Sequence, residues 1–205
     1  MNKAGDWDVV VVGAGHNGLV ASFYMGRAGL RVLVLEAQDT VGGACISQEV
    51  FPGYLHDPCA QVPSALQSEI WRDARLAERG SQTRNESMNA HVYPDGRHLV
   101  LSGDDSANFA EIAQFSRHDA ENYTRWIDFN VRVSRILQPY VMKPPVSLAR
   151  IFEDYRETED EELLTRLVTT SIGEILSDFF ESDEIIAAMW NPVDLGSLWE
   201  TGSGL

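Results

Sequence analysis

The chain has 205 residues, which is enough for one sizeable domain or for one domain and part of a second. Its formal charge of −15 is the opposite of the basic footprint of a nucleic-acid-binding protein, and no apolar run is long enough to span a bilayer. No signal peptide precedes the first apolar run, so we expect a cytoplasmic protein without a nucleic-acid partner or a transmembrane segment.

The first 36 residues predict a complete β-turn-α-β unit. Residues 7–12 read WDVVVV and residues 30–35 read LRVLVL, two β-branched or aliphatic runs typical of strands buried on both faces. Between them, residues 19–28 have a helical pattern that Gly29 is placed to end. A crossover this short makes the two strands parallel neighbours.

The turn between the first strand and the helix reads GAGHNG, with glycines at positions 13, 15 and 18. Gly13 permits a tight turn, Gly15 lets a pyrophosphate approach the backbone, and Gly18 lets helix and strand pack closely. The helix N-terminus offers free N–H groups and a positive dipole end to phosphates. This pattern, in this context, predicts a dinucleotide-binding site.

Glu36 ends the second strand, 18 residues after Gly18. A carboxylate at this place can accept hydrogen bonds from a ribose diol, and it disfavours a 2′-phosphate. Residues 36–44 then read EAQDTVGGA, and a second glycine pair just after the ribose acid favours FAD over NAD. We expect the loop bearing Gly42 and Gly43 to approach the cofactor closely. A simple NAD-binding module remains a weaker alternative.

Beyond this unit the sequence predicts one hairpin and then mostly helices. Pro52, Gly53, Pro58 and Pro63 indicate an irregular stretch, and Ser64 could cap a helix reaching about Glu78 with three arginines on one face. Residues 90–101 predict a hairpin around Pro94-Asp95-Gly96. Helical patterns follow over residues 106–115, 119–137 and 172–179, and Ser182 could cap a last helix.

Two compositional features leave alternatives open. Residues 153–205 contain 14 acidic and 2 basic residues, which indicates either a solvated surface or a face for a basic partner. The two cysteines, Cys45 and Cys59, form no CxxC pair, which argues against a disulfide-reductase type of flavoenzyme and suits a reducing compartment. A cysteine outside such a motif is most often a small core residue. The histidines have no metal-ligand spacing, so we predict no metal site.

The stretch from Asp8 to Pro58 resembles the N-terminus of the phytoene desaturase-like FAD-dependent oxidoreductases, above all in its GAGHNGL loop and VGGA turn. The hairpin VYPDGRHLVL and the stretch FAEIAQFSRHDAENYTRW are also similar to that family. The resemblance implies an α/β fold, with a Rossmann-type FAD-binding βαβ unit of incomplete sheet, a β-hairpin and a mostly helical partial substrate domain. It places the N-terminal part of the FAD-binding domain in residues 1–65 and the partial substrate domain in residues 66–205.

By the same resemblance, ten residues would bind FAD. The pyrophosphate would be lined by Gly13, Ala14, Gly15, His16, Asn17 and Gly18, the adenosine ribose would be held by Glu36, and the flavin side would be approached by Gly42, Gly43 and Ala44. Residues 56–60 would lie near the flavin ring. No catalytic residue is predicted, since the flavin itself takes the hydride.

The chain is less than half as long as a typical member of that family, and three interpretations are open. It is a fragment, an expression product, or one subunit of a split flavoenzyme whose second subunit completes the flavin site. The predicted function is hydride transfer from a C–C or C–N bond of an apolar or mixed small molecule to FAD. The alternative is an inactive fragment or accessory subunit that stabilises a partner.

Overall fold

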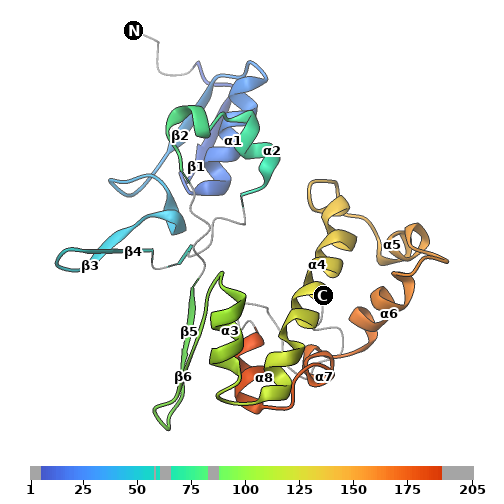
Figure 1. The fold of residues 1–205 in the computed structure, drawn as a ribbon. Helices are drawn as coiled ribbons and strands as arrows, with labels where there is room; N and C mark the ends of the chain where they lie inside the picture. The colour runs from blue at the N-terminus through green and yellow to red at the C-terminus, as the bar shows by residue number, and fades with distance from the viewer. Residues whose placement is uncertain (1–5, 58, 61–65, 83–87, 191–205) are drawn as a thin grey trace. The chain divides into compact units, whose positions relative to one another are not determined.

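A computed structural model of the chain describes residues 6–57, 59–60, 66–82 and 88–190. The chain divides into two compact units, residues 1–84 and 85–205 (Figure 1). The sequence predicted a different kind of boundary, the end of the FAD-binding portion after residue 65. That boundary stays a prediction.

The N-terminal unit contains the predicted βαβ element. Strand β1 (Val9–Val12) is followed by helix α1 (His16–Arg27) and strand β2 (Val32–Leu35). The strands are parallel, with Val9 opposite Val32 and Val12 opposite Leu35. The double contact of Asp8 with Arg31, through the Arg31 backbone N–H at 2.8 Å and its guanidinium at 3.0 Å, holds the starts of the two strands together.

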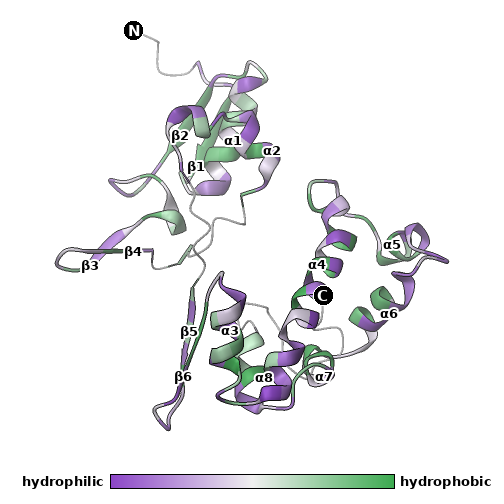
Figure 2. Cartoon of the chain, viewed as in Figure 1, coloured by the Kyte–Doolittle hydropathy of each residue, from purple (hydrophilic) through white to green (hydrophobic). Residues whose placement is uncertain are grey.

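The expectation that β1 is buried on both faces is wrong for the described residues. Val10 is 51% exposed and Val12 is 84% exposed, although β1 and β2 are made of apolar residues (Figure 2). Helix α1 lies against the other face of the sheet, where its Gly18 is next to the Val11 side chain. Since Val10 and Val12 point away from α1 and are exposed, the face of this sheet that bears them has no covering layer in the described part of the chain.

The stretch expected to be irregular contains a second hairpin. Strand β3 (Gln48–Phe51) pairs antiparallel with strand β4 (Tyr54–His56) across Pro52 and Gly53. The proline does not prevent the hairpin because it lies in the turn, where no ladder hydrogen bond is required of it. Gly53 has a φ of 85°, which a glycine adopts without strain. Before β3, the 3₁₀ turn η1 (Gly43–Cys45) follows the predicted glycine turn.

The helix expected to reach Glu78 is interrupted. Helix α2 (Ser68–Asp73) and the 3₁₀ turn η3 (Ala77–Arg79) are separated by Arg75, which has a φ of 52°. A left-handed residue ends a helix, so Arg72, Arg75 and Arg79 do not share one helical face. The proposed cap, Ser64, lies outside the described residues.

The C-terminal unit begins with the predicted hairpin, made of strands β5 (Asn89–Val92) and β6 (His98–Leu101). Six helices follow: α3 (Asp105–Ile112), α4 (Arg117–Val141), α5 (Leu148–Asp154), α6 (Glu161–Thr169), α7 (Ile172–Ser177) and α8 (Asp183–Met189). Helix α4 continues past Leu137, where the sequence predicted its end, and includes Pro139 before it stops at Val141. None of the helices in the described ranges has both the length and the apolar character that crossing a membrane requires.

The core of this unit is formed by β6 and the helices. Trp126 of α4 stacks on Phe129 and meets Phe179 and Phe180 edge-on, with ring centroids 5.5 to 6.0 Å apart. Ile175 and Leu176 of α7 are fully buried, as their helical spacing predicted. Aromatic and aliphatic burial of this kind is the main stabilising contribution to a helical unit.

Candidate dinucleotide-binding site

The glycine loop lies at the carboxyl end of β1, where ligands of open α/β sheets bind. Gly13 has a φ of 99°, and its backbone N–H donates to the Leu35 carbonyl at 2.7 Å. This bond holds the start of the loop against the end of β2. Ala14, which follows, is 1% exposed and is the one fully buried residue among those described in the N-terminal unit.

Gly18 is required because the loop and the helix approach each other too closely for a side chain. A Cβ atom at this position would lie 2.2 Å from the Gly13 carbonyl oxygen and 3.4 Å from Cγ1 of Val11. No real Cβ atom tolerates the first of these distances. The geometry therefore agrees with the predicted reason for this glycine, which is close packing of the helix on the strand.

The N-terminus of α1 has no side-chain cap that would compete with an anion. Helix α1 begins at His16 with Gly15 as its N-cap, no side chain caps it, and its first turn contains no acidic residue. The backbone N–H groups of His16, Asn17 and Gly18 have no acceptor within the helix, as in any first helical turn. A twelve-residue helix directs its dipole and these N–H groups toward the glycine loop.

Glu36 is hydrogen-bonded into the glycine loop. Its Oε2 accepts from the Ala14 N–H at 2.7 Å, and its Oε1 accepts from the Gln38 N–H at 2.9 Å. These backbone hydrogen bonds, with Gln38 the stronger influence, lower the pKa of Glu36, so the side chain is ionised at neutral pH. An ionised carboxylate has about four acceptor sites, which leaves capacity for the hydroxyls of a ribose.

The second glycine pair packs directly on the first loop. The Gly42 N–H donates to the Ala14 carbonyl at 2.8 Å, and Gly42 forms a parallel bridge with Gly15. A Cβ atom on Gly43 would lie 2.9 Å from Cα of Gly15. The sequence predicted close approach to a cofactor here; the structure has close approach of one backbone to another, which is a separate reason for glycine.

All ten predicted residues therefore belong to one cluster at the carboxyl ends of β1 and β2. The segment expected near the flavin ring also reaches this cluster, since the Ala60 N–H donates to the Ala44 carbonyl at 3.2 Å. Cys45 and Cys59, next to these two alanines, are both exposed, so they are not the small core residues that the sequence suggested. Residue 58 of that segment lies outside the described residues.

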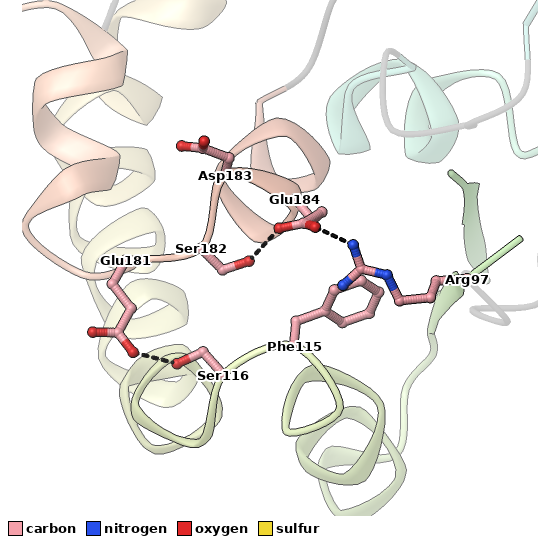
Figure 3. Close-up of a pocket in the computed structure, with 7 residues that line it drawn as sticks. All are labelled: Arg97, Phe115, Ser116, Glu181, Ser182, Asp183 and Glu184. Atoms are coloured by element: carbon pink, nitrogen blue, oxygen red, sulfur yellow. Dashed lines mark hydrogen bonds and ion pairs between the residues drawn. The ribbon is translucent and has the colours of Figure 1, made fainter. Parts of the chain in front are cut away.

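The C-terminal unit has a polar hollow of about 540 Å³. Figure 3 shows its lining: Arg97, Phe115, Ser116, Glu181, Ser182, Asp183 and Glu184. The polar groups there bind one another: Arg97 pairs with Glu184 and lies 4.8 Å from the Phe115 ring centroid, and the Ser116 hydroxyl donates to Glu181 at 2.8 Å. Groups already paired in this way stabilise the surface, and they give no preference for a ligand.

Asp119 is a buried charged residue that sequence reasoning missed. It is fully buried, and its two carboxylate oxygens accept from the Glu181 N–H at 2.8 Å and the Ser182 N–H at 3.0 Å. His118 and Glu181 lie beside it, with ligand-type atoms of all three within 4.8 Å of one another. Because both oxygens bind backbone N–H groups, the carboxylate connects α4 to the start of α8. Nothing in the local sequence signals a contact across more than 60 residues.

Comparison with known proteins agrees with a Rossmann-like fold in the N-terminal unit. Residues 11–75 match a family of domains described as "NAD(P)-binding Rossmann-like domain". The chain is 28% identical over 220 residues to pyridine nucleotide-disulfide oxidoreductase domain-containing protein 2 of Rattus norvegicus, covering 94% of this chain and 38% of the rat protein. It is 30% identical over 130 residues to phytoene desaturase (neurosporene-forming) of Rhodobacter capsulatus, covering 62% of this chain and 25% of that enzyme.

The chain is a homologue of the phytoene desaturase-like oxidoreductases. The matches span well under half the length of these relatives. Among solved structures, it is similar to a variant of putrescine oxidase, with a TM-score of 0.50 and 22% identity, covering 88% of this chain and 35% of that one. This likeness supports a Rossmann-like fold for the present chain.

Proposed function

We propose that this chain binds FAD and supplies the ADP-binding half of the flavin site of an oxidoreductase. The observation that carries the proposal is the arrangement of the backbone at the carboxyl ends of β1 and β2. There the glycine loop, the uncapped N-terminus of α1 and ionised Glu36 come together. The pyrophosphate would bind to Gly13–Gly18, the ribose to Glu36, and the flavin half would extend past Gly42, Gly43 and Ala44.

FAD is favoured over NAD because the second glycine pair is built onto the phosphate loop. Gly42 and Gly43 bring Ala44 and the following hairpin next to the place where the pyrophosphate would bind. A cofactor that extends along this edge meets a fixed backbone surface beyond the ribose acid. The proposed reaction is hydride transfer from a C–C or C–N bond of an apolar or mixed small molecule to the flavin, in which the protein binds and orients both reactants.

The uncovered face of the β1–β2 sheet supports a further proposal, that a second polypeptide segment completes the flavin domain. Val10 and Val12 are more than half exposed, and Leu35, opposite Val12 in the same sheet, is 48% exposed. Apolar strands of a parallel sheet are normally covered on both faces. The accessory role, in which the chain stabilises a partner subunit, rests on the same surface.

The test is the absorption spectrum of the purified chain after addition of FAD, alone and after co-expression with its genomic neighbours. FAD binding that NAD does not displace supports the proposal. Binding of NAD but not of FAD, alone and with every neighbour, would refute it. Flavin retained only with a neighbour would identify the second segment, and flavin retained equally by the chain alone would refute the need for one.

A further inference from the structure

The two arms of the β3–β4 hairpin stay in contact beyond its strands. Gln48 lies opposite His56 and Glu49 opposite Leu55. One step outward, the Ser47 hydroxyl bonds to the Asp57 carboxylate. Further out, the Ala60 N–H donates to the Ala44 carbonyl at 3.2 Å. These contacts hold the two arms of the hairpin close together as far as Ala44, which belongs to the 3₁₀ turn η1.

The Ala44–Ala60 hydrogen bond brings Cys45 near Cys59, because each cysteine is the direct chain neighbour of one of these two alanines. Both cysteines lie one residue inside the Ala44–Ala60 hydrogen bond, so neither chain can diverge far before the thiols are reached. Cysteines with Cα atoms about 4.4 to 6.8 Å apart are bridged without large backbone movement. Both residues are exposed and free, so small-molecule thiols and disulfides reach them.

We propose that Cys45 and Cys59 form a reversible disulfide, which makes the base of this hairpin a redox modification site. The oxidant is a low-molecular-weight disulfide such as oxidised glutathione. The thiolate of one cysteine attacks it and releases one glutathione thiolate. The other cysteine, after losing its proton to water, attacks the mixed disulfide and releases the second. Two protein thiols are oxidised, and one glutathione disulfide is reduced to two glutathione molecules.

The position gives the disulfide a structural consequence. It would close the hairpin into a loop and fix Cys59 to the segment that follows Gly42 and Gly43. That segment packs on Gly15 of the phosphate loop. Oxidation would therefore fasten the hairpin covalently to the second glycine loop. Reduction would leave these two segments joined through the Ala44–Ala60 backbone hydrogen bond.

The test uses the full chain equilibrated in glutathione redox buffers, with thiols alkylated and counted by mass spectrometry. Since the chain has two cysteines, an intramolecular bridge is identified by a monomer that accepts no alkyl group and is about 2 Da lighter than the reduced chain. The measurement is repeated in guanidinium chloride. We expect the effective concentration of the thiol pair to be at least roughly tenfold higher in the native chain than in the unfolded chain.

A register-shifted variant provides the control. Cys59→Ser combined with Ala60→Cys moves one thiol by one residue and should lose the native advantage, as should either single cysteine-to-serine change, which leaves only mixed disulfides. Equal effective concentrations in native and unfolded wild-type chain, or oxidation that yields only dimers and glutathione adducts, would overturn the proposal. The thiol count is independent of flavin binding, so it stands or falls separately from the proposed function.

Discussion

An alanine Cβ atom at position 18 would lie 2.2 Å from the Gly13 carbonyl oxygen, which is far inside van der Waals contact. Gly13 is required for a different reason, its φ of 99°, and an added Cβ there would meet nothing within 4 Å. A Cβ atom added to Gly15 would lie 3.8 Å from Cα of Gly43, an ordinary contact. Backbone conformation therefore requires glycine at position 13 and a steric clash requires it at position 18, whereas the chain's own geometry makes no such demand at position 15.

We expect Gly18→Ala to displace α1 from the phosphate loop and to abolish measurable FAD binding, because the first-turn N–H groups move with the helix. The matched control is Gly26→Ala on the same helix, where an added Cβ meets nothing within 4 Å. That change should leave binding intact and stabilise the chain by about 0.5–1 kcal/mol through helix propensity. Titration with FAD and thermal unfolding measure both variants, and equal affinities would contradict the steric argument.

Glu36 combines two tasks, since it accepts from the Ala14 N–H and is placed to accept from a ribose. We expect Glu36→Gln to weaken FAD binding about tenfold or more, the usual scale for hydrogen bonds to a charged group. Asp39→Asn, an exposed neighbouring carboxyl, serves as the control. Isothermal titration measures both, and a loss in the control equal to that in Glu36→Gln would point to net charge instead of the specific bond.

The contribution of Glu36 to stability and to FAD binding should depend on pH in one direction. The pKa of Glu36 is lowered below its ordinary value of 4.5, so the carboxylate is the form present at every pH above that value. Its contribution to stability and binding is complete above 4.5 and is lost only as the pH falls through the lower folded value. FAD affinity that declined between neutral pH and 5 would assign the loss to another group.

At the scale of elements, α4 connects distant parts of the C-terminal unit. Ser116 caps the start of this helix by accepting from the Asp119 N–H, and Asp119 then accepts from two N–H groups just before α8. Some carboxylates of the acidic run at residues 153–162 also form ion pairs within this unit. Asp154 pairs with Arg150 at 2.8 Å and Asp160 with Arg132 at 2.5 Å, so these two carboxylates have partners within the unit.

Asp119→Asn should destabilise the C-terminal unit by about 1–3 kcal/mol, since an amide NH₂ would face one of the two backbone N–H groups and leave it unpaired in a buried place. Urea unfolding followed by helical circular dichroism gives the value. The control is Glu121→Gln on the same helix, an exposed carboxyl paired only with Arg117, whose effect should stay within about 0.5 kcal/mol. Equal effects of the two changes would mean that burial of Asp119 contributes nothing special.

At the scale of the whole chain, two electrostatic effects act in opposite directions. The charge of −15 at pH 7 causes self-repulsion, which protonation of exposed carboxylates relieves. Paired carboxyls behave differently. Hydrogen bonds from Arg31 hold the pKa of Asp8 at about 2, and hydrogen bonds from the backbone N–H and the hydroxyl of Ser171 lower the pKa of Glu174. Groups with lowered pKa stabilise the fold above their ordinary values and lose this effect as the pH falls further.

We therefore expect stability to rise slightly as the pH falls from 7 toward 5, and then to drop as the pH falls from the ordinary glutamate value of 4.5 through about 2. Added salt should stabilise the chain at pH 7, because screening reduces the repulsion between exposed carboxylates. Thermal unfolding over a grid of pH and salt concentration measures both. A stability that increases steadily down to pH 3, or that falls with salt at pH 7, would contradict the balance described.

The sequence by itself determined the βαβ unit, the tight turn at Gly13 and the close packing at Gly18, because strand, turn and helix signals there are local. It also determined the β5–β6 hairpin, through Asp95 and Gly96. Only the tertiary structure decided that Gly43 packs on Gly15, that Asp119 binds the chain before α8, that Ala60 bonds to Ala44, and that Val12 lies exposed. Each of these depends on which distant segments meet, and neither residue spacing nor composition encodes that meeting directly.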